Sequence, residues 1–157
     1  MTNHNIQKIQ GYGSGSYLAS DVTVLLDIVN KDAVADVPVR QKEVLIQSGQ
    51  RHYSDMLTLE HAPTAMHEQL YQQALEQGTT RTATDIANLA YTLHHTFQQT
   101  VSPERPLVFV SLVRAGLPVG VLLQRALTDI DSSYALPSVH YGISIIRDRG
   151  LDAVALQ

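Results

Sequence analysis

The side chains best suited to chemistry in this sequence lie in residues 111–116, which read Ser-Leu-Val-Arg-Ala-Gly and follow an apolar run. Arg114 carries a planar guanidinium that stays charged and can donate two parallel hydrogen bonds to one phosphate or carboxylate. Gly116 would let a ligand approach the backbone closely, because it has no side chain. Ser111, Arg114, Ala115 and Gly116 are therefore a candidate anion-binding loop. A plain turn with a solvated arginine is the alternative, since such turns are common without a ligand.

Two further arginines, Arg147 and Arg149, follow a segment with the aromatic and β-branched content of a strand, at residues 139–146. Lysine occurs only at positions 8, 31 and 42, so the lysine of an ordinary ATP- or GTP-binding loop is absent from this part of the chain. Arginines after two strands suit a pyrophosphate or phosphoribosyl group better than a cradle built on one lysine. We therefore expect one anion site that uses Arg114, Arg147 and Arg149.

A third group of polar side chains lies in an expected loop and consists of Arg51, His52, Tyr53 and Ser54. Binding residues often cluster on loops, which makes these four candidates for contact with a ligand. The alternative is a turn whose polar groups bond the local backbone, because His and Tyr are often only half-buried. Taken alone, the residues favour the turn.

Two other polar groupings carry little chemistry. The glycine-serine run at residues 11–16 lacks the preceding strand that a nucleotide-binding loop requires, so we interpret it as a flexible loop. His94 and His95 are adjacent on an expected helix, where neighbouring side chains point about 100° apart and do not share a metal ion. We expect no metal site built from protein side chains.

A strand, a turn and a helix are expected to position Arg114. Residues 107–110 are apolar, β-branched and aromatic, as in a parallel strand that is covered on both faces. A helix should begin near Leu117, because Pro118 suits the first turn of a helix. Residues 139–146 predict a second strand, joined to the first by a right-handed parallel crossover. The carboxyl ends of both strands would then meet at one sheet edge, where open α/β sheets bind ligands.

The spacing of apolar residues also predicts four helices, at about residues 21–30, 39–48, 64–77 and 80–99. Gly49 and Gly78 are placed to end the second and third of them. Asp152 is placed to cap a final helix. Only two parallel strands are predicted in the whole chain.

Composition narrows the class of protein. The chain has 157 residues, 44% hydrophobic and 17% charged, which is one domain's worth of globular sequence. Its net charge of −4 argues against general binding to nucleic acid or anionic lipid. It contains no cysteine, so these residues hold no disulfide, thiolate metal ligand or cysteine nucleophile. Since no apolar run is as long as a membrane span and the N-terminus is too polar for a secretory signal, a cytoplasmic location is expected.

Three segments that occur in a fixed order give the sequence a family resemblance: residues 48–57, 110–123 and 140–152. They resemble segments of the phosphoribosyltransferase-like family that is associated with tellurite-resistance and stress-response operons. Some members of that family are called cysteine protease StiP. The resemblance extends from about Gly15 to the end of the chain.

The resemblance implies an α/β fold with a type I phosphoribosyltransferase-like (Rossmann-like) parallel sheet. Residues 1–63 would form an N-terminal helical or hood segment, and residues 64–157 the first part of the core. The loop at residues 111–116 would hold the diphosphate of phosphoribosyl diphosphate together with Mg²⁺, and Arg147 and Arg149 would reach the same phosphates. The hood over a base-like acceptor would include Arg51, His52, Tyr53 and Ser54. Transfer of the phosphoribosyl group would rest on positioning and charge stabilisation.

We expect the sheet to be incomplete at the C-terminus, because the sequence shows no later strand with an acidic, Thr/Gly-rich ribose-binding loop. The catalytic residues therefore stay unassigned, and the chain is expected to bind its ligand without turnover. The alternative is a non-catalytic module, or a truncated fragment, that binds a nucleotide or a protein partner. No membrane partner is expected, and a homodimer is one of the assemblies left open.

Overall fold

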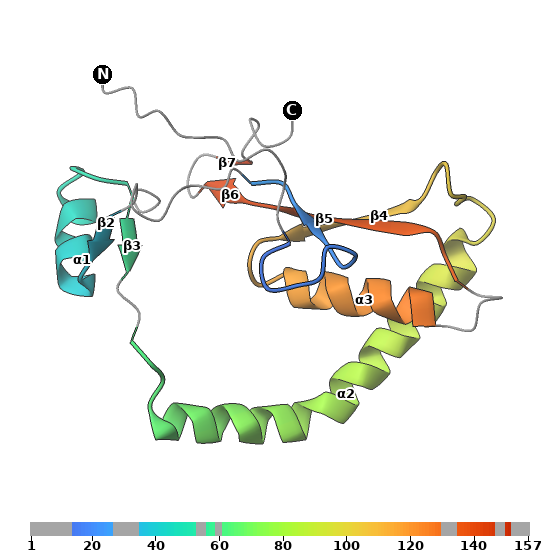
Figure 1. The fold of residues 1–157 in the computed structure, drawn as a ribbon, viewed down its shortest axis with the longest axis horizontal. Coiled ribbons are helices and arrows are strands. Elements are labelled where there is room, and N and C mark those ends of the chain that lie inside the picture. Colours follow the sequence, from blue (N-terminus) through green and yellow to red (C-terminus); the bar gives the residue numbers. More distant parts are fainter. Residues whose placement is uncertain are drawn as a thin grey trace.

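A parallel sheet of three strands, in the order β1-β5-β4, forms the main body of the molecule (Figure 1). The computed structural model describes residues 14–26, 35–52, 56–58, 61–129, 135–146 and 150–151. Strand β4 (Leu107–Leu112) pairs with β5 (Ser138–Ile143), which pairs in turn with β1 (Thr23–Val24); both pairings are parallel. The fold is therefore α/β with a small parallel sheet, and β1 adds a strand that the sequence did not predict.

Helix α3 (Leu117–Asp129) connects β4 to β5 and lies along one face of the sheet (Figure 1). Pro118 stands in its first turn, where a backbone N–H would have no partner within the helix. The predicted strand, helix start and parallel pairing of the two strands are confirmed. The strand continues beyond residue 110, because Ser111 and Leu112 pair with β5 instead of entering the turn.

The helix predicted at residues 21–30 is wrong in its described part, where Thr23 and Val24 form β1. Thr23 pairs with Tyr141 and Val24 with Gly142 of β5. The β-branched side chains of residues 22–24 suit an edge strand, and pairing with β5 outweighs the helical spacing of the apolar residues. Residues 27–30 lie outside the described part of the chain.

One long helix, α2 (Ala65–Phe97), replaces the two helices predicted at residues 64–77 and 80–99. It begins where the Thr64 hydroxyl accepts a hydrogen bond from the His67 N–H. The prediction that Gly78 ends a helix is wrong, because a glycine inside a helix costs only about 1 kcal/mol relative to alanine. The C-terminal half of α2 packs near α3, while its N-terminal half extends away from the sheet (Figure 1).

A second, smaller unit lies at one end of the molecule and contains β2 (Ala35–Val37), α1 (Val39–Gln47) and β3 (Met56–Thr58) (Figure 1). Its two strands pair in parallel. The helix predicted at residues 39–48 is confirmed. Gly49 follows it with a φ of 69°, a left-handed conformation that favours glycine and ends the helix as predicted.

The second predicted strand, residues 139–146, is interrupted at Ser144. After that residue, β6 (Ile145–Ile146) pairs in the antiparallel sense with β7 (Gly150–Leu151). The helix predicted to follow Asp152 lies outside the described residues.

Two apolar clusters join α3 to its neighbours. One contains Val22, Leu117 and Val121, and the other joins Leu127 of α3 to Ala90 of α2 and to Leu136. Within the described ranges, no helix is long and apolar enough to cross a membrane. The division of the chain at residue 63 and the cytoplasmic location stay predictions.

Candidate functional site

The turn after β4 holds the arginine that the sequence singled out. Arg114 and Ala115 are both exposed at the carboxyl end of the strand. The Gly116 N–H donates to the Leu112 carbonyl at 2.9 Å, which closes the turn, and the Val113–Arg114 peptide bond is cis. An exposed guanidinium at the carboxyl edge of a parallel sheet can contact an anionic group of a ligand.

Gly116 has a structural reason to be glycine that does not involve a ligand. A Cβ at this position would lie 3.0 Å from both the backbone nitrogen and the carbonyl oxygen of Leu112. The backbone of the turn folds back so closely on the end of β4 that a side chain at residue 116 would push against the strand backbone. Close packing of the turn therefore accounts for this residue without the ligand approach that the sequence suggested.

Ser111 is not part of the turn, which corrects one member of the predicted loop. It belongs to β4, its side chain faces α3, and the residue is only 8% exposed. Its Oγ lies 2.8 Å from Nε2 of His140 on the neighbouring strand β5. His140 was not among the predicted site residues, because a histidine inside a strand pattern gives no sign of the hydroxyl that it contacts in the fold.

The second nitrogen of His140 fixes how the proton is shared with Ser111. Nδ1 lies 3.0 Å from the backbone carbonyl oxygen of Asp21, which can only accept a hydrogen bond. In the neutral ring, Nδ1 therefore carries the hydrogen, and Nε2 accepts from the Ser111 hydroxyl. This is the arrangement in which a histidine activates a hydroxyl nucleophile.

Helix α3 closes the Ser111–His140 pair off from substrates. A Cβ at Gly120 of α3 would lie 2.5 Å from Ser111 Oγ and closer still to Nε2 of His140. His140 is 3% exposed, so both partners lie between the sheet and the helix. The pair thus joins β4 to β5 beneath α3 and is not open to a peptide or nucleotide.

The side chain of Asp21 makes a second connection between α3 and the N-terminal part of the chain. Arg125 of α3 donates to its two carboxylate oxygens, from Nε at 2.8 Å and from Nη2 at 2.6 Å, and the Leu18 N–H donates to the same group at 3.0 Å. The bond to Arg125 holds the pKa of Asp21 below its usual value, against the opposing effect of burial. Asp21 is therefore charged near neutral pH and ties α3 in place.

The remaining predicted site residues are divided between the small unit and undescribed parts of the chain. Arg147, Arg149, Tyr53 and Ser54 lie outside the described residues, so their predicted roles stay predictions. Arg51 is exposed and His52 is half-buried, and both follow α1 in the small unit. The carboxyl ends of β4 and β5 point toward the side of the molecule where that unit lies (Figure 1).

A groove of about 580 Å³ lies between α2 and α3 and was not predicted. Its walls are mostly small or apolar, and its polar members include Thr79, Thr82, Arg125 and Asp129. No residue of the turn after β4 lines it. It is therefore a separate feature of the surface.

Metal binding finds no support in the described part of the chain. There, no group of three or more His, Cys, Asp or Glu side chains is placed to hold an ion. The expected Mg²⁺ was to be bound through diphosphate, and it stays a prediction.

These features define an α/β protein with an exposed arginine at the carboxyl edge of its sheet and a closed serine–histidine pair beneath it. Residues 15–157 match the family described as "Tellurite-like stress resistance cysteine protease StiP", and the chain belongs to that family. It is 47% identical over 148 residues to a protein of Acinetobacter baylyi (strain ATCC 33305 / BD413 / ADP1) called "Cysteine protease StiP". That alignment covers 94% of this chain and 35% of the relative. No solved structure matches the chain.

The comparisons correct the function that the sequence analysis inferred. The family and the relative are both named as a cysteine protease, so the predicted phosphoribosyltransferase activity and phosphoribosyl diphosphate binding are contradicted. The family's description agrees with the stress-resistance context that the sequence suggested. The finer assignment of the sheet to the phosphoribosyltransferase type is not supported by any solved structure. Arginines at a sheet edge indicated an anion but not which molecule carries it.

Proposed function

We propose that this chain is part of a stress-resistance cysteine peptidase whose nucleophilic cysteine lies outside these 157 residues. The supporting observation is the 47% identity, over 94% of the chain, to the protein called cysteine protease StiP. A cysteine peptidase needs a thiolate nucleophile, and this sequence contains no cysteine. The chain spans 35% of the length of that relative, so most of a family-length protein lies elsewhere.

In such an enzyme, the residues of this chain would hold the peptide substrate. Arg114 is the best candidate, because its exposed side chain stands at the sheet edge where α/β proteins bind ligands. A guanidinium binds a carboxylate through two parallel hydrogen bonds. We therefore infer a preference for peptides with an acidic side chain or a free terminal carboxylate near the cleaved bond.

The chemical steps would come from outside this chain. The thiolate attacks the peptide carbonyl carbon, the amine leaves with a proton from a general acid, and water then releases the acyl group. We assign neither the attack nor the proton transfer to the Ser111–His140 pair, because Gly120 packs directly over it. That pair joins β4 to β5 next to the turn.

The cysteine proposal is tested by replacing each cysteine of a full-length StiP-family polypeptide that contains this sequence with serine. One substitution should abolish both cleavage of a labelled casein substrate and survival of the host on tellurite. The remaining substitutions should leave both readouts at the parent level. A polypeptide that tolerates every substitution would overturn the proposal.

The role of Arg114 is tested in the same polypeptide with Arg114→Ala. Loss of a charge-assisted hydrogen bond should raise KM for an acidic peptide about ten- to a hundred-fold, while a neutral peptide is cleaved as before. The matched control is Arg81→Ala, because Arg81 lies on α2 with an 89% exposed side chain and pairs only loosely with Asp85 at 3.8 Å. Equal losses for both peptides would show that Arg114 does not read the substrate's charge.

A further inference from the structure

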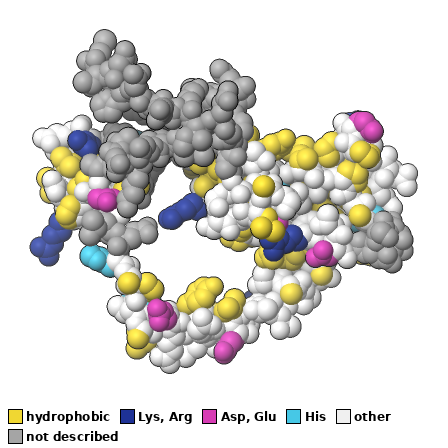
Figure 2. Space-filling model, viewed as in Figure 1, with side chains coloured by type: hydrophobic (Ala, Val, Ile, Leu, Met, Phe, Trp, Pro, Cys, Tyr) yellow, Lys and Arg dark blue, Asp and Glu magenta, His cyan; other side chains and the backbone are white. Residues whose placement is uncertain are grey.

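The face of β4 and β5 that lies away from α3 carries apolar and aromatic side chains and is left without a covering element in the described part of the chain. Val108, Val110 and Leu112 of β4 are 53%, 59% and 47% exposed. Their partners on β5 are Val139, Tyr141 and Ile143. We call these six residues the bare face. Hydrophobic side chains gather over β4 and β5 on the side away from α3 (Figure 2).

The distribution of polar residues between the two faces of β4 differs from that of a strand with one face in water. In β4, Leu107, Phe109 and Ser111 point toward the α3 side, where Leu107 and Phe109 pack on a buried cluster and Ser111 meets His140. The polar residue of the strand is therefore on the covered face, and only apolar residues are on the bare one. A strand with one solvated face normally places its polar residues toward water.

Strand β4 is also open along one edge. It pairs with β5, and no other described strand pairs with it. Parallel sheets occur almost only where helices cover both faces, and their strands then read as near-continuous apolar runs. The run Leu-Val-Phe-Val-Ser-Leu at residues 107–112 fits a strand that is buried on both sides.

We propose that the bare face is the docking surface for the remaining part of a full-length StiP-family polypeptide, which covers it with at least one helix. The chain spans 35% of its Acinetobacter baylyi relative, so a family-length protein has ample further chain for this purpose. An apolar surface shared by two strands is matched by the apolar stripe of a helix. The proposal concerns packing and does not depend on peptidase chemistry.

The matched pair of positions for a test is Val110 on the bare face and Val44 on α1, which are 59% and 63% exposed. Val110→Cys and Val44→Cys are introduced one at a time into this chain, which has no other cysteine. A maleimide should label both at similar rates, because both side chains reach water. In a full-length polypeptide that contains this sequence, labelling at position 110 should fall on the order of a hundred-fold relative to position 44. After proteolysis, mass spectrometry of the peptides that contain positions 110 and 44 measures the labelling of each introduced cysteine separately from that of native cysteines.

Three results would overturn the proposal. The first is equal labelling of the two sites in the full-length polypeptide. The second is protection of position 110 in the 157-residue chain that disappears on dilution, because a second copy would then be the occupant. The third uses Val110→Thr, which keeps the shape of valine: in the full-length polypeptide it should lower Tm more than Val44→Thr does. Equal Tm values for these two variants would contradict docking at the bare face.

Discussion

The described part of the chain contains the strand–helix–strand crossover twice, and the two units differ in how much apolar surface they bury. In the β4–α3–β5 unit, the strands span six residues each and α3 contributes Leu117, Val121 and Leu127 to buried clusters. In the β2–α1–β3 unit, the strands span three residues each. Val37 and Met56 are its buried apolar residues among those described. The larger unit therefore has a substantial hydrophobic core, whereas the smaller unit buries few apolar side chains.

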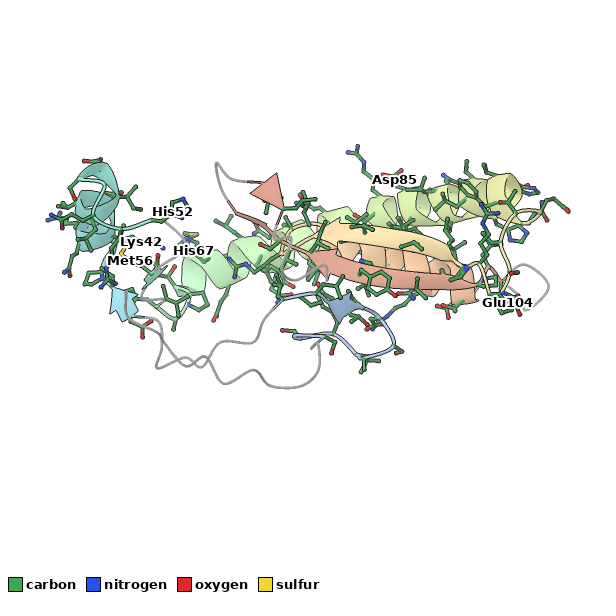
Figure 3. All side chains as sticks on the ribbon, turned by 90° about the horizontal axis from the view of Figure 1, so that it is seen from above. Lys42, His52, Met56, His67, Asp85 and Glu104 are labelled. Atoms are coloured by element: carbon green, nitrogen blue, oxygen red, sulfur yellow. The ribbon has the colours of Figure 1, made fainter. Side chains whose placement is uncertain are left out.

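The buried polar groups of the two units differ in the same way. In the larger unit, Ser111 and His140 are buried, hydrogen-bonded to each other and in close contact with Gly120. In the smaller unit, Lys42 on α1 reaches β3 with a long flexible chain, where it donates to the Met56 carbonyl at 2.9 Å and the Thr58 hydroxyl at 3.2 Å (Figure 3). A close-packed polar pair tolerates little added side-chain volume, whereas a flexible lysine can change its conformation when a neighbour changes. The larger unit should therefore respond more strongly to substitution.

The largest loss of stability is expected from Gly120→Ala in the larger unit. The added Cβ would lie 2.5 Å from Ser111 Oγ, so α3 must shift or the serine–histidine bond must break. Overpacking of this kind costs about 1–3 kcal/mol of the free energy of unfolding. Urea denaturation followed by circular dichroism measures it.

Gly78→Ala on α2 is the matched control, because a Cβ there meets no atom within 4 Å. It should raise stability by about 0.5–1 kcal/mol through helix propensity alone. If Gly120→Ala were as stable as Gly78→Ala, the α3–sheet contact would be loose, and the contrast between the two units would fail.

A smaller effect, dependent on pH, is expected from the Asp21–Arg125 ion pair that also holds α3. The pKa of Asp21 is lowered in the folded state by its bond to Arg125. The stability that this ion pair contributes is therefore present above the ordinary carboxyl pKa and is lost as pH falls through the lowered value. Tm should therefore drop as pH falls below about 4, and the Asp21→Asn variant should lose less over that window. Because the Arg125 side chain is half exposed, added salt should weaken the contribution.

The control for this titration is Asp85→Asn on α2. Asp85 pairs with Arg81 at 3.8 Å, and both side chains are largely exposed. An exposed pair of this kind contributes little to stability, so its removal should leave the dependence of Tm on pH unchanged. Parallel pH profiles for the parent and Asp21→Asn would show that Arg125 does not hold Asp21 in its charged form.

The larger unit was predictable because its signals are local. An apolar run, a glycine turn and Pro118 in sequence specify a strand, a turn and a helix without any distant contact. The Ser111–His140–Asp21 connections were not predictable, since they join residues 29 and 119 positions apart. The spacing in residues 21–30 fits a helix, and only the presence of β5 makes it a strand.

The function was harder to predict than the fold, for a physical reason. Arg114 can bind any group with two oxygens in a plane, so its charge and position indicate an anion without distinguishing a diphosphate from a peptide carboxylate. The nature of the nucleophile was equally hidden, because the chain holds no cysteine. A site on a shared fold is defined by its reacting atoms, and these 157 residues do not contain the proposed thiol.

The smallest effect is expected in the smaller unit, from Lys42→Met. The variant removes the ammonium that donates to the Met56 carbonyl and the Thr58 hydroxyl, but it keeps an unbranched side chain of similar length. Loss of these two hydrogen bonds is partly offset because no charge has to be buried, so we expect about 1 kcal/mol of local destabilisation. Hydrogen exchange of the β3 amides should quicken while the global Tm stays near that of the parent. Arg40→Met, on the exposed side of α1, should leave the same amides unchanged. A fall in global Tm as large as that of Gly120→Ala would mean that the two units unfold together.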